Sequence, residues 1–310
     1  MFFQFENDQL TETTVEGLRE GLLTAGCIPA AELPEIAARF GFDPVTVDAC
    51  LDANTSFRSA VEVYQDYTFT ELRIMNLHEE EDDYIALYLL RNMILVVDIM
   101  DNDSSTRNKY LAAIRRYPPE KTSCEKILAA FLESLMAGDQ TVLEKVENEM
   151  ELQEEALLNR SADKDFDMRL LKSKQLLSRR HIYYDQLLDV TEAVSENDNE
   201  IFRDDQLIFV DNVSKRITRL QTDVDMLRNT VEHLQDAYTS WLDSQMNRTM
   251  KIFTVLTSVF FPLTIIVGWY GMNFTTMPEL TWKYGYVFVI LLSVVTVVLL
   301  YWIGKKKKWF

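Results

Sequence analysis

Hydrophobic and polar residues follow three different patterns along the chain. Up to about residue 118, short apolar runs alternate with glycine, proline and acidic clusters, which is typical of an α/β domain. Neither glycine nor proline occurs between Gly138 and Pro262, so long helices are expected there. The C-terminal part holds the longest uncharged runs. The expected parts are an α/β domain (1–118), a helical hairpin (119–199), a stalk helix (200–270), a loop (271–283), a second apolar span (284–304) and a basic tail (305–310).

The first part should contain both helices and strands. Helices are expected over 32–40 and from Asp43-Pro44 onward, and a strand over 67–77. The runs 84–90 and 93–98 flank Arg91-Asn92, which predicts a β-hairpin. The acidic run 79–83 is expected to be a solvated loop between strands, and a metal-binding role for it is the less favoured interpretation.

Three long helices are expected next, at 122–159, 164–195 and 200–269. The last would be about 105 Å long at about 1.5 Å per residue, too long for one globular core. Its apolar residues recur in heptads, which fits an oligomer seam or an amphipathic helix packed on its own domain. The two series are Val210, Ile217, Val224, Val231 and Tyr238, and Val213, Leu220, Leu227, Leu234 and Trp241.

Two uncharged runs, 252–277 and 284–304, are long enough to cross a bilayer, because about 20 apolar residues span its hydrocarbon core. The first span should cover about 252–270. Arg248 and Lys251 precede it, and a lysine run at 305–308 follows the second. The positive-inside rule therefore predicts that both termini lie in the cytoplasm. The N-terminus also shows no basic segment followed by a long apolar run, so no signal peptide is expected.

One face of the first span is unusually polar for a membrane helix. Small, polar and a few bulky residues share it, as expected for a pore lined by several copies or for close helix packing. These candidate pore-lining residues are Asn247, Met250, Phe253, Thr257, Phe261, Thr264 and Gly268.

Composition and scattered residues exclude several classes of protein. The formal net charge of −18 argues against a nucleic-acid partner. The three cysteines form no CxxC pair, which favours a reducing cytoplasm over a disulfide framework. No nucleotide-binding motif or nucleophile–base spacing is present, so neither an organic cofactor nor an enzyme is expected.

At the outer end of the first span stands Tyr270-Gly271-Met272-Asn273, followed closely by Met277-Pro278-Glu279-Leu280. With Phe261-Pro262-Leu263-Thr264 and the terminal lysine run, this segment resembles the CorA family of magnesium channels. The resemblance implies an α+β membrane protein that forms a homopentamer and takes up Mg²⁺, with Co²⁺ and Ni²⁺ as further candidate ions, across the cytoplasmic membrane. It assigns the selectivity filter to Gly271, Met272 and Asn273. It also places narrow apolar rings at Phe253 and Phe261.

Two departures from the family pattern affect the expected site. Thr275 stands where relatives often carry an acid, so attraction of cations in the outer loop would rest on Glu279. Relatives close when Mg²⁺ binds between cytoplasmic domains, and Asp236 matches one such position by its distance from the filter. Its partner position falls on Ala49, which leaves Asp48 as the nearest acid.

Two other functions stay open. A ZntB-type zinc transporter would usually carry valine at Met272, and zinc prefers imidazole and thiolate ligands, which lie outside both spans here. A membrane-anchored helical scaffold would use the heptads equally well. It would have no need of Gly-Met-Asn at the end of a helix.

Overall fold

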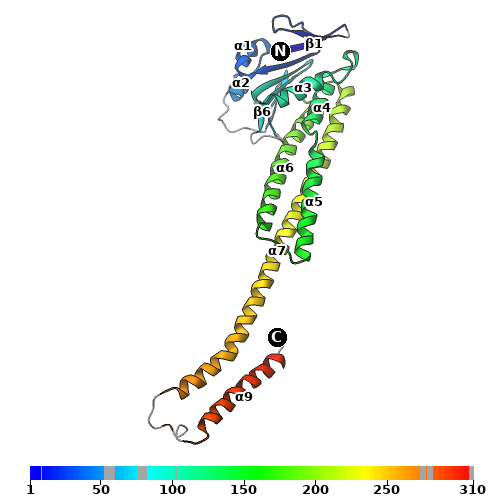
Figure 1. The fold of residues 1–310 in the computed structure, drawn as a ribbon. Coiled ribbons are helices and arrows are strands. Elements are labelled where there is room, and N and C mark those ends of the chain that lie inside the picture. The colour runs from blue at the N-terminus through cyan, green and yellow to red at the C-terminus, as the bar shows by residue number, and fades with distance from the viewer. Residues whose placement is uncertain are drawn as a thin grey trace. The chain divides into compact units, whose positions relative to one another are not determined.

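The computed structural model describes residues 1–7, 9–51, 60–75, 82–101, 103–272, 277 and 282–306. These residues form two compact units, Met1–Leu234 and Gln235–Phe310. Figure 1 shows the elements of each unit in chain order. Because helix α7 (Leu207–Tyr270) contributes to both units, it is described twice below.

A seven-stranded mixed sheet forms the centre of the N-terminal part of the first unit. Its strand order is β2-β1-β3-β7-β6-β5-β4, and only β3 and β7 run parallel. The strands are β1 (Phe2–Glu6), β2 (Gln9–Thr13), β3 (Thr24–Pro29), β4 (Val61–Val63), β5 (Tyr67–Ile74), β6 (Asp83–Leu90) and β7 (Met93–Met100). The central strands β6 and β7 are almost continuously apolar because both of their faces are buried.

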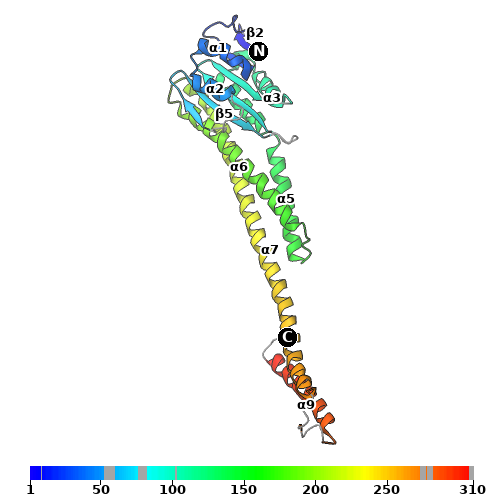
Figure 2. The ribbon, with the colours of Figure 1, turned by 90° about the vertical axis from the view of Figure 1, so that its left-hand side faces the viewer.

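Helices cover both faces of the sheet, as Figure 2 shows. Helices α1 (Leu33–Phe40) and α2 (Pro44–Leu51) pack on one face, in a core that includes Phe69, Tyr88 and Leu95. Helices α3 (Ser105–Ile114) and α4 (Cys124–Leu135) pack on the other, where the Tyr110 hydroxyl donates to the Ile94 carbonyl at 2.9 Å. These elements confirm the predicted helix over 32–40, the predicted start of a second helix at Asp43-Pro44, and the hairpin at Arg91-Asn92.

The prediction of a solvated acidic loop over 79–83 is wrong for its last two residues. Asp83 begins β6 and is buried, and its carboxylate accepts from the Thr106 hydroxyl at 2.7 Å. The neighbouring Asp82 is also buried and pairs with Arg73 at 2.6 Å and Arg179 at 2.8 Å. Residues 79–81 lie outside the described part of the chain.

Two of the three predicted long helices have different limits. The segment 122–159 is two helices, α4 and α5 (Asp139–Leu158), because Gly138 has φ = 91°, a left-handed conformation that interrupts a helix. The helix expected from residue 200 begins at Leu207. Asn197 ends α6 (Phe166–Glu196) at φ = 51°, and its side chain bonds the backbone of Phe202.

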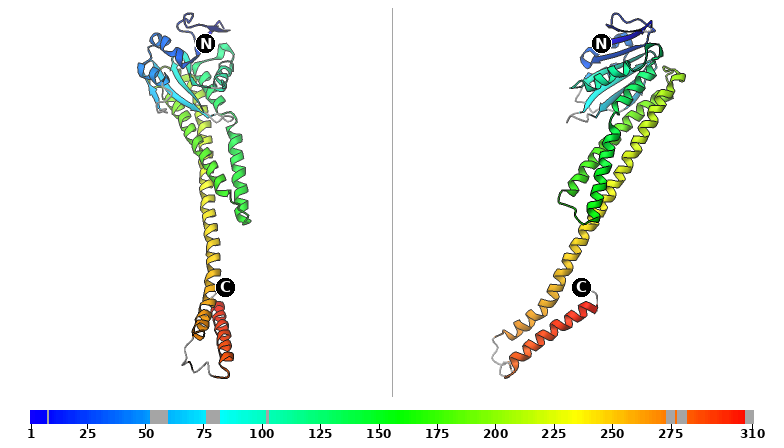
Figure 3. Two further views of the ribbon diagram at one scale, coloured as in Figure 1. Left: turned by 60° about the vertical axis from the view of Figure 1, so that its left-hand side comes forward. Right: turned by 45° about the vertical axis from the view of Figure 1, so that its right-hand side comes forward.

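The first half of α7 packs on its own domain, beside α5 and α6 (Figure 3). Eight of the ten heptad residues, from Val210 to Leu234, are buried within the first unit. Polar contacts to α6 flank this seam: Ser195 donates to Asp211 at 2.8 Å, and Lys174 lies 3.4 Å from Glu232. Of the two interpretations of the heptads, packing on the chain's own domain is therefore the one that the structure supports for Val210 to Leu234.

The second unit contains the rest of α7 and helix α9 (Gly285–Lys306). Both helices are long and apolar enough to cross a membrane, and their apolar windows are almost entirely exposed in the single chain. The predicted order of an α/β domain, a long helix and two C-terminal apolar helices is thus confirmed.

Candidate functional site

Every described member of the predicted pore-lining face and filter is exposed in the single chain. On α7 these residues are Asn247, Met250, Phe253, Thr257, Phe261, Thr264 and Gly268, and Gly271 and Met272 follow the helix. Asn273 and Glu279 lie outside the described residues. The face therefore has no partner within the described part of its own unit.

The opposite face of the same segment is partly covered. Val255, Val259, Pro262 and Ile266 recur every three or four residues and are only partly accessible. Helix α9 runs alongside and carries a similar partly covered row, including Val289, Thr296 and Leu300 (Figure 3). At 3.6 residues per turn, the centres of the covered and exposed faces lie about 180° apart on α7.

A polar heptad stripe follows the exposed face. We use this name for two series of residues that alternate by four and three from Asp236 to Gly271, all of them exposed. The first series is Asp236, Asp243, Met250, Thr257, Thr264 and Gly271, and the second is Ser240, Asn247, Thr254, Phe261 and Gly268. Sequence reasoning missed Ser240, Asp243 and Thr254, although a search for heptads of polar rather than apolar residues would have found them.

The three threonine hydroxyls of the stripe donate their protons within the helix. Thr254 donates to the Met250 carbonyl at 2.8 Å, Thr257 to the Phe253 carbonyl at 2.8 Å and Thr264 to the Phe260 carbonyl at 2.9 Å. Such bonds satisfy a hydroxyl donor without any second chain. The remaining lone pairs on each oxygen can only accept, which suits the outward-pointing hydrogens of a hydrated cation.

Gly271 closes the helix where a side chain would not fit. Its amide donates to the Val267 carbonyl at 2.9 Å, and a Cβ built on Gly271 would lie 2.9 Å from that same oxygen. Glycine therefore lets α7 make a tight final turn immediately before Met272. About two and a half helical turns before Gly271 lies Pro262, which has no amide proton. The Ser258 carbonyl therefore loses its usual helical partner.

The two predicted regulatory carboxylates are both exposed. Asp48 lies on α2 in the first unit, and Asp236 lies on α7 in the second. Asp236 is also the first residue of the polar heptad stripe. Its distance from Asn273, on which its regulatory role was predicted, did not show this.

A separate group of carboxylates lies at the end of β7. Oxygens of Asp83, Asp101 and Asp103 fall within 4.8 Å of one another, close enough to share a cation. Burial, with Asp83 nearby, raises the pKa of Asp101 above its usual value, although a hydrogen bond from the backbone amide of Arg107 acts to lower it. Burial likewise raises the pKa of Asp98. This group belongs to the first unit and shares no residue with the stripe.

A comparison with protein-family models assigns most of the chain to one family. A model of the family described as "CorA-like Mg2+ transporter protein" matches residues 29–306. The chain is 29% identical over 279 residues to the "Cobalt/magnesium transport protein CorA" of Thermotoga maritima, covering 87% of this chain and 77% of that one. It is 23% identical over 284 residues to the "Putative metal ion transporter YfjQ" of Bacillus subtilis, covering 87% and 84%.

The whole chain also superimposes on a solved structure. The complete structure of the CorA magnesium transporter from Methanocaldococcus jannaschii superimposes with a TM-score of 0.76 at 19% identity, covering 100% of this chain and 98% of that one. At this identity the likeness concerns the fold.

Proposed function

Because the chain belongs to the family of CorA-like Mg2+ transporter proteins, we propose that it conducts hydrated Mg²⁺, and secondarily Co²⁺ or Ni²⁺, into the cytoplasm through a homo-oligomeric pore. Family membership makes the chain a membrane protein whose two C-terminal helices cross the bilayer, and a transporter rather than an enzyme. The stoichiometry, orientation, ion path and regulation below are parts of the proposal.

The polar heptad stripe is the observation that carries this proposal. A face exposed to lipid should be apolar, because hydrocarbon offers no partner to polar groups. A seven-residue repeat keeps one face toward a common axis when several helices supercoil left-handedly. A polar face with that repeat, opposite the face covered beside α9, therefore fits α7 helices from several copies around a water-filled pore. A homopentamer agrees with the family pattern.

Neutral oxygens would select the ion at the outer end. Mg²⁺ gives up its water reluctantly, so a filter can recognise the hydrated ion through its first shell of water. The Asn273 amide oxygen and the Gly271 carbonyl, repeated around the axis, would form rings of acceptors, a known design for filters. Below them, Phe253 and Phe261 would supply the apolar constrictions, and Glu279 would attract cations to the outer mouth.

The membrane potential would drive uptake. With both termini in the cytoplasm, a divalent cation moving inward through 100 mV gains about 4.6 kcal/mol, twice the roughly 2.3 kcal/mol per charge. Cytoplasmic Mg²⁺ would close the pore by binding carboxylates at subunit boundaries, with Asp236 as the main ligand and Asp48 as the candidate from the neighbouring domain. Mg²⁺ would thus be both the transported ion and the regulator.

A ZntB-like zinc transporter is the nearest alternative function. Its expected valine is replaced here by Met272, and His78, His181, His233 and the three cysteines all lie outside the apolar spans. A helical scaffold that transports nothing would need no polar repeat on a membrane-spanning helix, so the polar heptad stripe favours transport.

Uptake of Mg²⁺ and of Zn²⁺ into liposomes containing the purified full-length chain tests the proposal directly. We expect uptake of Mg²⁺ that increases with an inside-negative potential, and little uptake of Zn²⁺. A detergent-solubilised particle with the mass of one or two chains, or liposomes that take up neither ion, would contradict it.

A further inference from the structure

Asp243 occupies a position in the polar heptad stripe that the resemblance does not assign. It lies one heptad after Asp236 and one heptad before Met250, in the series that ends at Gly271. At about 1.5 Å per residue, about 10.5 Å of helix separates Asp243 from each of these neighbours. It is exposed in the single chain. If the stripe faces the axis, the Asp243 carboxylates of all copies face it as well.

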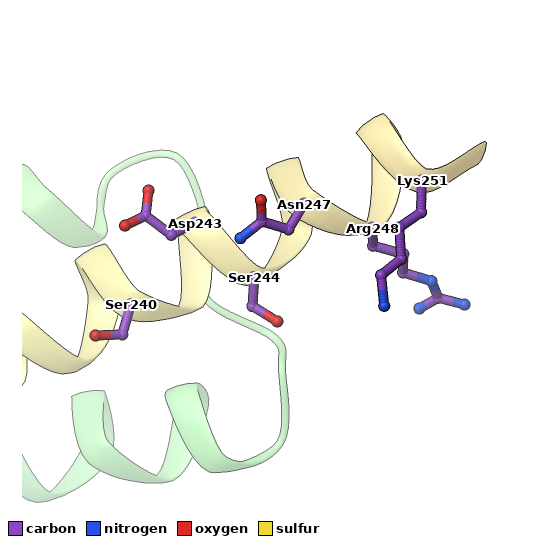
Figure 4. A pocket seen from close by; sticks show the side chains of 6 residues that line it. All are labelled: Ser240, Asp243, Ser244, Asn247, Arg248 and Lys251. Carbon is purple, nitrogen blue, oxygen red and sulfur yellow. The ribbon is translucent and has the colours of Figure 1, made fainter. Parts of the chain in front are cut away.

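The surroundings of Asp243 are polar and open. Asp243 lines a surface pocket of about 490 Å³ together with Ser240, Ser244, Asn247, Arg248 and Lys251. Figure 4 shows Asp243 and Asn247 on adjacent turns of one side of α7, while Arg248 and Lys251 extend away from Asp243. Within the described part of the chain, Asp243 makes no ion pair. The carboxylate is therefore available to a cation from outside the chain, and the Asn247 amide lies on the next turn of the helix.

We propose that Asp243 and Asn247 of the assembled copies form a second ion-binding level, which holds a hydrated divalent cation between Met250 and Asp236. This inference rests on the proposed function. A ring of carboxylates repels itself unless a cation occupies its centre, so the level favours occupancy by a divalent ion. The Asn247 amide oxygen would accept hydrogen bonds from the ion's water while the carboxylates balance its charge.

Trp241 provides a native reporter for this level. It lies two residues before Asp243 on α7 and stacks on Tyr238, with ring centroids 5.7 Å apart. Tb³⁺, a hard cation that binds carboxylates, luminesces when a nearby excited tryptophan transfers energy to it. Bound at the Asp243 level, it should be sensitised by Trp241, and Mg²⁺ should displace it. This measurement reports binding without depending on transport.

The experiment uses the full-length protein in detergent, with particle mass as the check on folding and assembly. We expect Asp243→Asn to reduce the Mg²⁺-displaceable Tb³⁺ signal about tenfold, the lower end of the range by which a charged site concentrates counter-ions. Trp241→Phe should also reduce the signal, because it removes the residue that transfers energy to Tb³⁺. Asp243→Glu and the matched control Asp223→Asn, an exposed acid of α7 outside the stripe, should retain the signal.

Flux measurements separate this inference from the proposed function. Asp243→Asn should lower Mg²⁺ uptake at subsaturating Mg²⁺, and the deficit should persist in about 1 M monovalent salt, where the Debye length is only about 3 Å. An unchanged Tb³⁺ signal in Asp243→Asn, or a wild type with no such signal, would overturn the inference while leaving uptake by the wild type intact. Absence of wild-type uptake would instead overturn the proposed function.

Discussion

Helix α7 presents the same heptad spacing in its two halves but fills it with opposite chemistry. From Val210 to Leu234 the repeated residues are apolar and buried within the first unit. From Asp236 to Gly271 a second repeat, displaced to the other side of the helix, is mostly polar and exposed, with Met250 and Phe261 as its large apolar members. A single helical register thus serves two purposes, because the spacing fixes only which residues share a face. The residue types decide what that face contacts.

The difference also separates stability from function. The apolar repeat is covered by its own chain, so its residues should contribute to the unfolding free energy of one subunit. The polar repeat has no cover in the single chain, so its residues should contribute little to that free energy and much to transport. The following predictions test this separation, from the largest expected effect to the smallest.

Loss of the filter amide should have the largest effect. Asn273→Ala should reduce Mg²⁺ uptake into liposomes to background, because the ring would lose its acceptor for the hydrated ion, while particle mass and thermal stability stay unchanged. The matched control is Asn229→Ala, an exposed asparagine of α7 outside the polar heptad stripe. Wild-type uptake by a correctly assembled Asn273→Ala channel would show that this ring is not the filter.

A truncation in the apolar repeat should do the reverse. Ile217 is 0% exposed, and Ile217→Ala should lower the unfolding free energy by about 2–5 kcal/mol, the range for large-to-small substitutions in a core. Thermal unfolding measures this loss. Uptake per correctly folded channel should stay near the wild-type rate. A large fall in that specific rate would mean that the two repeats are not functionally separate.

The first carboxylate of the stripe should set the metal dependence of closure. Asp236→Ala should raise the Mg²⁺ concentration that half-protects the protein from protease by about tenfold, because the affinity of oxygen-ligand sites follows their ligand charge. Asp48→Ala should shift it less. Equal protection of wild type and Asp236→Ala by millimolar Mg²⁺ would remove Asp236 from the regulatory site.

The smallest effect concerns a carboxylate of the first unit that lies outside both repeats. Burial raises the pKa of Asp101 above its usual 3.8. The native state therefore binds this proton more tightly than the unfolded chain, and the group's contribution to stability falls as pH rises through the window above 3.8. Asp101→Asn should stabilise the protein slightly at pH 7, and this gain should disappear near pH 4.

Thermal unfolding at the two pH values measures this change. Asp205→Asn provides the contrast, since a hydrogen bond from Gln206, together with Arg203, lowers the pKa of Asp205. That substitution should not stabilise the protein at either pH. Equal effects of the two substitutions would show that burial of Asp101 is not the cause.

Local patterns in the sequence predicted those elements whose ends are marked by turn residues a few positions away. The Arg91-Asn92 hairpin and the helix that ends before Gly41 follow from turn chemistry a few residues long. The break at Gly138 was not predicted, because a glycine inside a helical pattern does not by itself show which conformation tertiary packing will select. Strand β3 was missed, and its parallel partner β7 is distant in the sequence. Strands β1, β2 and β4 were also missed, although β1 pairs with β2 and β4 with β5 across short turns.

The candidate site was predictable only in part, for a physical reason. A helical face follows from spacing, so the exposed side of α7 could be proposed from residues such as Thr257 and Gly268. The surface that the apolar heptads contact could not be predicted in this way. Packing within one chain and packing between copies require the same residues at the same spacing. Only the burial of residues such as Val224 distinguished them.

The continuity of α7 has a mechanical consequence. Between Leu207 and Pro262 the helix contains no proline or glycine, so a twist applied at its buried half turns Phe253 and Thr257 through the same angle. Beyond Pro262, where a backbone hydrogen bond is missing, this torque is expected to dissipate. Rotation of the helix would therefore widen or narrow the proposed constriction below Pro262, and the proposed selectivity ring above it would keep its shape.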